Sequence, residues 1–252
     1  MQKPGIKRYV LITGAAGGIG KELVNEFIRG EYIVIAMDLV AQPEDLICTY
    51  YLQYNLEYFV NDLAYSDRVL CEIKKIIAQN GLYALINNAG IQILGGTDSL
   101  TREIWKQSIN VNLLAPFYLS QALLSDLEEA KGCIVNISSI HARLTKNNFL
   151  AYSTTKAALS SMTKAMAVDL GGRIRVNAVE PAAIETDMLK SGFLNSPDKY
   201  KMLSEYHPAG IIGNAIELSK LVRSIVEIDS GFFTGEVIAY DGGISAVLHD
   251  PC

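Results

Sequence analysis

The chain is poor in the residues that build disulfide frameworks and metal sites. Its 252 residues include 4 cysteines and 3 histidines. The cysteines are widely spaced and form no CxxC pair, and the histidines show no spacing typical of zinc ligands. A chain of this length can bury enough apolar surface to fold without covalent staples. We therefore expect no metal site, no disulfide framework and the reducing cytoplasm as its location.

Long apolar runs and an excess of positive charge are also missing. No run approaches the length of a membrane-spanning helix, and residues 1–5 contain no apolar signal region. Lys and Arg number 22 against 27 Asp and Glu, a formal net charge of −5, and no stretch concentrates basic residues. Because binding to nucleic acid phosphates requires a basic face, we expect neither a nucleic acid nor a membrane as partner.

Two apolar patterns alternate along the chain. Helical stripes such as Ile19, Leu23 and Phe27 lie between short continuous apolar runs, which are typical of strands buried on both faces of a parallel sheet. The alternation predicts an α/β fold: a single domain over residues 1–252, with a Rossmann-type doubly wound sheet of about seven strands and helices on both faces. The runs that predict strands begin at Tyr9, Ile33, Ala84, Cys133, Ile174 and Val237.

Two further regions have weaker patterns. Residues 41–57 indicate a loop with a possible turn of helix, and we predict a third strand just after it, at Tyr58–Asn61. Residues 186–213 are mixed in character and lack sheet periodicity. Long segments of this kind inside a compact fold are often lids or binding loops, so this one is predicted to be a substrate lid.

The first strand runs into a glycine-rich turn, residues 13–20, and a helical pattern follows at once. Glycines at Gly14, Gly18 and Gly20 allow a tight turn and a close approach of backbone to a pyrophosphate, and Ile19 begins the helical stripe. The helix start offers unpaired N–H groups to that phosphate. The context predicts a dinucleotide site, the alternative being a tight turn that binds no ligand.

An acid, Asp38, ends the second strand run. A carboxylate in this position can accept hydrogen bonds from both ribose hydroxyls of NAD and would repel the 2′-phosphate of NADP. Ala15, Ala16 and Gly17 place no basic side chain in the turn to receive that phosphate. The position therefore favours NAD as the cofactor, unless Asp38 is only a solvated loop acid.

A second group of residues suggests proton chemistry. Tyr152 and Lys156 are four residues apart, on one face of a predicted helix. An ammonium beside a phenol favours the phenolate and lowers the pKa of the tyrosine, which can then act as a general base or acid. Ser139 lies 13 residues upstream at the end of a buried strand run, where ligands bind in open α/β sheets.

These motifs together resemble the short-chain dehydrogenase/reductase superfamily, from about residue 9 to residue 243. Their order along the chain matches the family, and their joint occurrence is highly specific. The markers are Thr13-Gly14, Gly18-Ile19-Gly20, Asp62-Leu63, Asn87-Asn88-Ala89-Gly90, Asn112, Ser139, Tyr152, Lys156, Asn177, Pro181, Thr186 and Asp241-Gly242-Gly243.

The resemblance implies roles for four residues in catalysis. Tyr152 would be the acid/base, and Lys156 would hold the nicotinamide ribose and lower the pKa of that tyrosine. Ser139 would bind the substrate oxygen, and Asn112 would hold a water in a proton relay.

The resemblance also implies contacts to the cofactor. At one position among these contacts the sequence differs from the usual family pattern: Ala182 follows Pro181, where the family usually has Gly. The contacts would be Asp62 and Leu63 near the adenine, Asn88, Ala89 and Gly90 along the cofactor, and Pro181, Ile184 and Thr186 near the nicotinamide.

The predicted function is NAD-dependent interconversion of a secondary alcohol and a ketone. Polar residues after Ser139, His141 foremost, favour a small polar substrate such as a sugar, polyol or hydroxy acid, contacted by Ser139, His141 and Tyr152. The alternative is that most of these polar side chains face water. An NADP-dependent 3-oxoacyl-carrier-protein reductase, a cofactor-binding regulatory protein and an extended epimerase or dehydratase remain alternatives. The resemblance implies a homotetramer or homodimer built through the helices that carry Asn112 and Tyr152.

Overall fold

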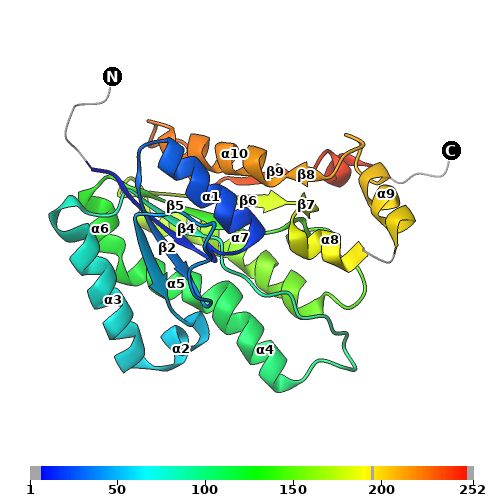
Figure 1. Ribbon diagram of the computed structural model, residues 1–252, viewed down its shortest axis with the longest axis horizontal. Coiled ribbons are helices and arrows are strands. Elements are labelled where there is room, and N and C mark those ends of the chain that lie inside the picture. The colour runs from blue at the N-terminus through cyan, green and yellow to red at the C-terminus, as the bar shows by residue number, and fades with distance from the viewer. Residues whose placement is uncertain (1–6, 194–195, 249–252) are drawn as a thin grey trace.

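A computed structural model describes residues 7–193 and 196–248 as an α/β fold around one large parallel sheet (Figure 1). The sheet has seven strands in the order β3-β2-β1-β4-β5-β6-β9, and each neighbouring pair is parallel. The fold class predicted from the apolar runs is confirmed. The strands are β1 (Tyr9–Thr13), β2 (Ile33–Asp38), β3 (Tyr50–Gln53), β4 (Ala84–Asn87), β5 (Cys133–Ile137), β6 (Arg175–Pro181) and β9 (Val237–Tyr240).

Alternate residues of the strands supply two separate cores, one on each face of the sheet. On one face, Val10 and Val34 pack with Leu23 and Phe27 of α1 and with α10, and on the other, Leu11 packs with α3, α5, α6 and α7. Figure 1 shows α1 and α10 lying together over one face. The helices are α1 (Gly18–Arg29), α2 (Leu56–Asn61), α3 (Leu63–Ile77), α4 (Arg102–Ile109), α5 (Ala115–Ala122), α6 (Leu124–Glu129), α7 (Leu150–Leu170), α8 (Asp187–Phe193), α9 (Pro197–Glu205) and α10 (Ala215–Glu227).

The third strand lies earlier in the chain than the apolar pattern predicts. Tyr58–Asn61 is wrong as a strand, because this run belongs to helix α2. The side chain of Asn55 caps that helix by accepting hydrogen bonds from the N–H groups of Glu57 and Tyr58. The real third strand, β3, lies inside the segment predicted as loop and pairs with β2 at the sheet edge. Its half-exposed position explains why it lacks a continuous apolar run.

From β1 the chain builds toward one edge of the sheet through β2 and β3. It then returns to the other side of β1 and builds toward the opposite edge, beginning with β4. In such sheets ligands bind beyond the carboxyl ends of the strands at the reversal point. The turns after β1, β2, β4 and β5 all end at this edge. They carry most of the residues that the sequence singles out.

Residues 186–213, predicted to be a lid, carry α8 and α9. Both helices lie at one end of the sheet (Figure 1), and two short strands, β7 (Ile184–Glu185) and β8 (Gly213–Asn214), pair at the base of the segment. This pairing holds the two ends of the segment together while its helices extend away from the main sheet. A hollow of about 130 Å³ lies at this base, between Ala182 and His207. None of the helices among the described residues has the length and apolar character needed to cross a membrane.

Candidate active site

The glycine-rich turn joins β1 to α1 and leaves no room for side chains. Gly14 has a φ of +64°, and a Cβ there would lie 2.7 Å from the Cα of Ala89. A Cβ on Gly20 would lie 2.0 Å from the carbonyl oxygen of Gly14. No side chain caps the start of α1 at Gly17, so the first N–H groups of this helix depend on a partner from outside it. The turn therefore has the shape and polarity of an anion-binding site.

Thr186 lies against the start of α1. A Cβ on Gly18 would come within 2.7 Å of the Thr186 Cγ2 atom, so the two residues are in close contact although 168 positions apart. The hydroxyl of Thr186 accepts a hydrogen bond from the N–H of Leu189 and so fixes the first turn of α8. The structure thus brings the predicted nicotinamide-side residue Thr186 to the predicted phosphate turn. Ile184, two residues earlier, is buried in β7.

Thr13 fastens the turn after β4 to the glycine-rich turn. Its hydroxyl oxygen accepts hydrogen bonds from the N–H groups of Asn88 (3.1 Å) and Ala89 (3.0 Å). The Asn88 side chain donates in return to the carbonyl oxygens of Thr13 and Gly14, each at 3.0 Å. The Asn88 amide therefore holds two loops together. Thr13 belongs to the sequence motif, but the sequence alone does not predict this role.

Asp38 ends β2 beside the same turn. One carboxylate oxygen accepts a hydrogen bond from the N–H of Ala16 at 2.8 Å, and the other accepts one from Val40 at 3.3 Å. Burial and the Asp38 charge raise the pKa of the neighbouring Tyr51 to about 12. The predicted acid thus lies beside the glycine-rich turn, and its contact with a ribose stays a prediction. Tyr51, which the sequence does not single out, lies near it.

Asp62 and Leu63 have a local structural role. The Asp62 carboxylate accepts a hydrogen bond from the N–H of Tyr65 and caps α3, and Leu63 begins that helix with a largely exposed side chain. Within the described part of the chain, neither residue is hydrogen-bonded to the glycine-rich turn. Their contact with an adenine stays a prediction.

Ser139 and Tyr152 meet at the end of β5. Ser139 is buried directly after this strand, and Tyr152 lies in the first turn of α7. Burial raises the pKa of Tyr152, while its hydrogen bond with Ser139 acts in the opposite direction. The tyrosine is therefore protonated at neutral pH.

Lys156 is completely enclosed one helical turn after Tyr152. Its ammonium donates a 2.7 Å hydrogen bond to the carbonyl oxygen of Ile137 and lies 5.8 Å from the centre of the Tyr152 ring. Burial lowers the pKa of Lys156 to about 8. A Cβ on Gly90 would lie 3.2 Å from its Nζ, so the turn after β4 reaches the same point. Burial is the largest effect on the Tyr152 pKa and raises it, so a lowering contribution from Lys156 stays a prediction.

Asn112 lies in a π-helical segment, Asn110–Leu114, between α4 and α5. Its amide oxygen accepts a hydrogen bond from the N–H of Ile91, and its amide nitrogen donates to the Ile91 carbonyl and to the hydroxyl of Thr155. The side chain thus joins the turn after β4 to α7. A role in holding water remains a prediction, and both polar atoms of the side chain already have protein partners.

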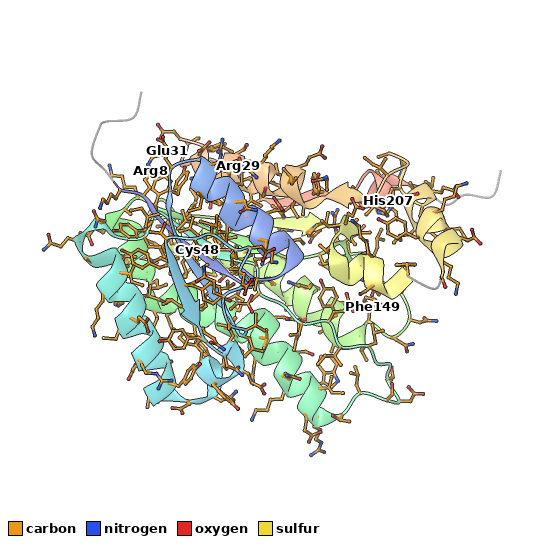
Figure 2. The ribbon with its side chains drawn as sticks, viewed as in Figure 1. Arg8, Arg29, Glu31, Cys48, Phe149 and His207 are labelled. Atoms are coloured by element: carbon orange, nitrogen blue, oxygen red, sulfur yellow. The ribbon has the colours of Figure 1, made fainter. Side chains whose placement is uncertain are left out.

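His141 lies beside the tyrosine. Its ring stacks on Phe149 at 4.4 Å and meets the ring of Tyr152 edge-on at 5.7 Å. Its Nδ1 atom is 3.1 Å from the hydroxyl of Thr145. Burial and, to a lesser degree, the charge of Lys146 lower the pKa of His141 to about 4, so the imidazole is neutral at neutral pH. Phe149, which sequence reasoning missed, lies toward the end of the molecule that carries α8 and α9 (Figure 2).

The nicotinamide end of the predicted site is held by β6 and β9. Pro181 ends β6 and is buried, and the N–H of Ala182 donates a 3.0 Å hydrogen bond to the carbonyl oxygen of Tyr240. Alanine in place of the usual glycine is thus accommodated, since Ala182 has no positive φ. Three buried asparagines near this edge hold the fold through hydrogen bonds: Asn87 to Asn136, Asn136 to Thr163, and Asn177 to Phe233 and Glu236.

The donor set of this edge fits a nicotinamide dinucleotide. Backbone and glycines form a phosphate turn at Gly14–Gly20, and a carboxylate stands at its ribose side in Asp38. A buried ammonium and a phenol, Lys156 and Tyr152, lie at the other end, beyond the turn containing Gly90. The phosphate turn and the carboxylate are groups that such a ligand uses in doubly wound folds.

Comparison with known proteins agrees with this geometry. The family model described as short chain dehydrogenase matches residues 8–196. The protein FixR of Bradyrhizobium diazoefficiens is 33% identical over 250 residues, covering 95% of this chain and 87% of that protein. The L-xylulose reductase of Caenorhabditis elegans is 30% identical over 244 residues and covers 94% and 95% of the two chains.

Solved structures extend the likeness to three dimensions. The ligand-free aldohexose dehydrogenase of Thermoplasma acidophilum aligns over 98% of this chain and 97% of its own, with a TM-score of 0.89 and 26% identity. Two further structures with a TM-score of 0.85 bind different nicotinamide cofactors: 4-hydroxyisoleucine dehydrogenase holds NADH and ElxO holds NADP. With its fold, its glycine-rich turn and its family match in agreement, the chain belongs to the short-chain dehydrogenase family of oxidoreductases.

Proposed function

We propose that the protein is an NAD(H)-dependent oxidoreductase that interconverts a secondary alcohol and a ketone on a small polar substrate. The observation that carries the proposal is the meeting of Ser139, Tyr152 and Lys156 at the edge of the sheet, beside the glycine-rich turn. The bound nicotinamide would supply the hydride chemistry.

Tyr152 is the proposed proton donor and acceptor. Its raised pKa keeps it protonated at neutral pH, the form that donates a proton to a carbonyl oxygen. When an alcohol is oxidised to a ketone, the phenolate of Tyr152 is required to accept the hydroxyl proton. The Lys156 ammonium, 5.8 Å from the centre of the Tyr152 ring, would stabilise that anion. The Ser139 hydroxyl lies within hydrogen-bonding reach of Tyr152 and would hold the substrate oxygen beside it.

Asp38 supports NAD as the preferred cofactor. Its carboxylate is fixed by the N–H of Ala16 beside the glycine-rich turn, where we expect the adenosine ribose to bind. A 2′-phosphate there would meet a like charge, which costs binding free energy. The same carboxylate is the main observation against the NADP-dependent 3-oxoacyl-carrier-protein reductase alternative.

His141 supports a polar substrate. The imidazole is neutral and stands beside Tyr152, and its Nδ1 is engaged by Thr145, which leaves Nε2 for another partner. A neutral imidazole can donate or accept one hydrogen bond at such a position. Substrates named for two of the similar proteins, xylulose and aldohexoses, are sugars, in keeping with this choice.

Three further features complete the proposal. Residues 186–213 would close over the substrate, with Thr186 and Ile184 beside the nicotinamide. The protein would assemble as a homotetramer or homodimer through α4–α5 and α7. It would work in the cytoplasm on a small-molecule alcohol or ketone.

The direct test is the change in nicotinamide absorbance on mixing the protein and NAD with polyols, sugars, hydroxy acids and hydrophobic alcohols. We expect turnover with NAD and with polar alcohols. Turnover on hydrophobic alcohols alone would overturn the polar-substrate proposal, and turnover only with NADP would overturn the cofactor choice. NADH binding without turnover of any alcohol would favour the regulatory alternative.

A further inference from the structure

A buried carboxylate lies behind the helix that carries Tyr152 and Lys156. Glu180, next to the end of β6, has a side chain only 2% exposed. One of its oxygens is 2.6 Å from the Arg143 Nε, and the other accepts a hydrogen bond from Ser160 at 2.7 Å. Burying a carboxylate is costly unless it is paired and hydrogen-bonded, and both of these oxygens are.

The hydrogen bonds continue from Glu180 toward the site. The hydroxyls of Ser160 and Ser138 are 2.8 Å apart, and Ser138 also donates to the carbonyl oxygen of Lys156 at 2.9 Å. Because the ionised Glu180 can only accept, Ser160 must give its single proton to it. Ser138 must then share its own proton between Ser160 and the Lys156 carbonyl. The direction of every bond in the chain is therefore fixed by the negative charge at Glu180.

These bonds join β6 to the two segments that carry the proposed reacting side chains, the loop after β5 and helix α7. Ser138 immediately precedes Ser139. Arg143 follows the short 3-10 turn η3 (Ile140–Ala142), which contains His141. Lys156, whose carbonyl accepts from Ser138, and Ser160 lie about one and two helical turns after Tyr152 in α7.

We propose that Glu180 is a positioning residue: by holding Arg143 and Ser160 together, it sets the turn that carries Ser139 and His141 against the turn of α7 that carries Tyr152 and Lys156. Its role in turnover rests on the function proposed above, whereas its role in positioning His141 does not. Glu180 touches none of the proposed reacting groups directly. The effect is therefore expected on rate and on the surroundings of His141, with binding of the cofactor left intact.

A second buried carboxylate offers a matched control. Glu26 in α1 has a side chain 6% exposed and pairs with Arg29 (3.0 Å) and Arg223 (3.1 Å) in the contact between α1 and α10. It has the same chemistry and similar burial, but its ion pairs join α1 to α10 and not the segments that carry Ser139, His141 and Tyr152. Substitutions at Glu26 therefore report what the loss of a buried ion pair does to the fold alone.

The experiment compares Glu180→Gln with Glu26→Gln. Glutamine keeps the shape and the acceptor for Ser160 but removes the charge that holds Arg143. Two readouts are used: kcat with NAD and an alcohol accepted by the wild type, and NMR titration of the His141 ring, assigned with His141→Gln. Arg143→Gln breaks the same pair from its half-exposed end and serves if Glu180→Gln fails to fold.

We expect Glu180→Gln to lower kcat by about 10-fold, below the ~100-fold that a misplacement of 1 Å can cost. NADH affinity should be unchanged. The pKa of His141 should rise from about 4 toward its ordinary value of 6.5 as the turn loosens from Phe149, Tyr152 and Lys146. Arg143→Gln should act alike, and the double variant should be no worse than either single one. Glu26→Gln should change neither readout.

An unchanged kcat and an unchanged His141 titration in Glu180→Gln would overturn the proposal, as would equal changes in Glu26→Gln. If the wild type turns over none of the alcohols, the proposed function fails instead. The His141 titration, which needs no substrate, then decides the role of Glu180 alone.

Discussion

The two sides of the proposed active site are built from different materials. On the side of β1 and α1, the site consists of backbone and glycines, with Gly14 and Gly20 too close to neighbouring backbone to carry a Cβ. On the side of β5 and α7, it consists of reactive side chains set by buried polar contacts, such as the bond from Lys156 to the Ile137 carbonyl. In the proposed function, the first side would select the cofactor by shape, and the second would set the protonation of the groups that react with it.

Substitutions on the two sides should therefore have different effects. A methyl group added to the glycine side should spoil binding, because the backbone has no room to move aside. Removing a side-chain hydroxyl on the side of β5 and α7 should slow turnover and leave cofactor binding intact.

The largest effect is expected for Tyr152→Phe. Loss of the phenol removes the general acid or base, which is worth about 10²- to 10⁴-fold in rate. The ring remains to pack against His141 and Phe149, so the fold should be retained. The measurement is kcat by NADH absorbance, and turnover near the wild-type level would show that Tyr152 has another role.

Gly20→Ala should produce the next largest effect, on binding. The new Cβ would lie 2.0 Å from the Gly14 carbonyl oxygen, so the turn must open. We expect a loss of about 1–3 kcal/mol in the free energy of unfolding, as for other overpacked sites, and a clear fall in NADH affinity by fluorescence titration. Gly172→Ala, where a Cβ meets nothing within 4 Å, is the matched control and should change neither.

Asp38→Ala should have a smaller effect, on cofactor choice. Removing the carboxylate beside Ala16 takes away a ribose acceptor and a charge that opposes a 2′-phosphate. The ratio of kcat/KM with NAD to that with NADP should fall by about 10-fold, the equivalent of about 1.4 kcal/mol. If the ratio stays the same, Asp38 does not contact the ribose.

The smallest effect is expected for His141→Gln, on how the stability of the fold changes as the pH falls. Its pKa is about 4 in the folded chain against 6.5 ordinarily, so as the pH falls through this window the unfolded state binds the proton first. The neutral, buried histidine therefore costs stability between pH 6.5 and pH 4. His141→Gln should lose less melting temperature over that window than the wild type. Equal losses would mean that His141 is not held neutral by burial.

The sequence predicts the sheet well where strands are buried on both faces. Runs such as Cys133–Ile137 have no exposed position, so the apolar pattern alone locates them. The apolar pattern does not predict β3, because this edge strand is half exposed. It wrongly predicts a strand at Tyr58–Asn61, because the cap at Asn55 starts a helix there. Local patterns cannot reveal which neighbour a short segment will pair with.

The site residues follow the same rule. Glycines that need a special backbone, and a Tyr and Lys on one helix face, are visible in the sequence. The balance of effects on Tyr152 is not, because burial of the phenol depends on the packed site and outweighs the contact with Ser139. Glu180 is also invisible, since its partners Arg143 and Ser160 come together only in the fold.

The central claim is that binding and chemistry belong to different sides of the site. It is tested most directly by measuring NADH affinity and alcohol turnover together in Tyr152→Phe and Gly20→Ala. The account predicts that Tyr152→Phe binds NADH like the wild type and turns over at least about 100-fold more slowly, whereas Gly20→Ala loses NADH affinity. Loss of NADH affinity in Tyr152→Phe, or full affinity in Gly20→Ala, would contradict it.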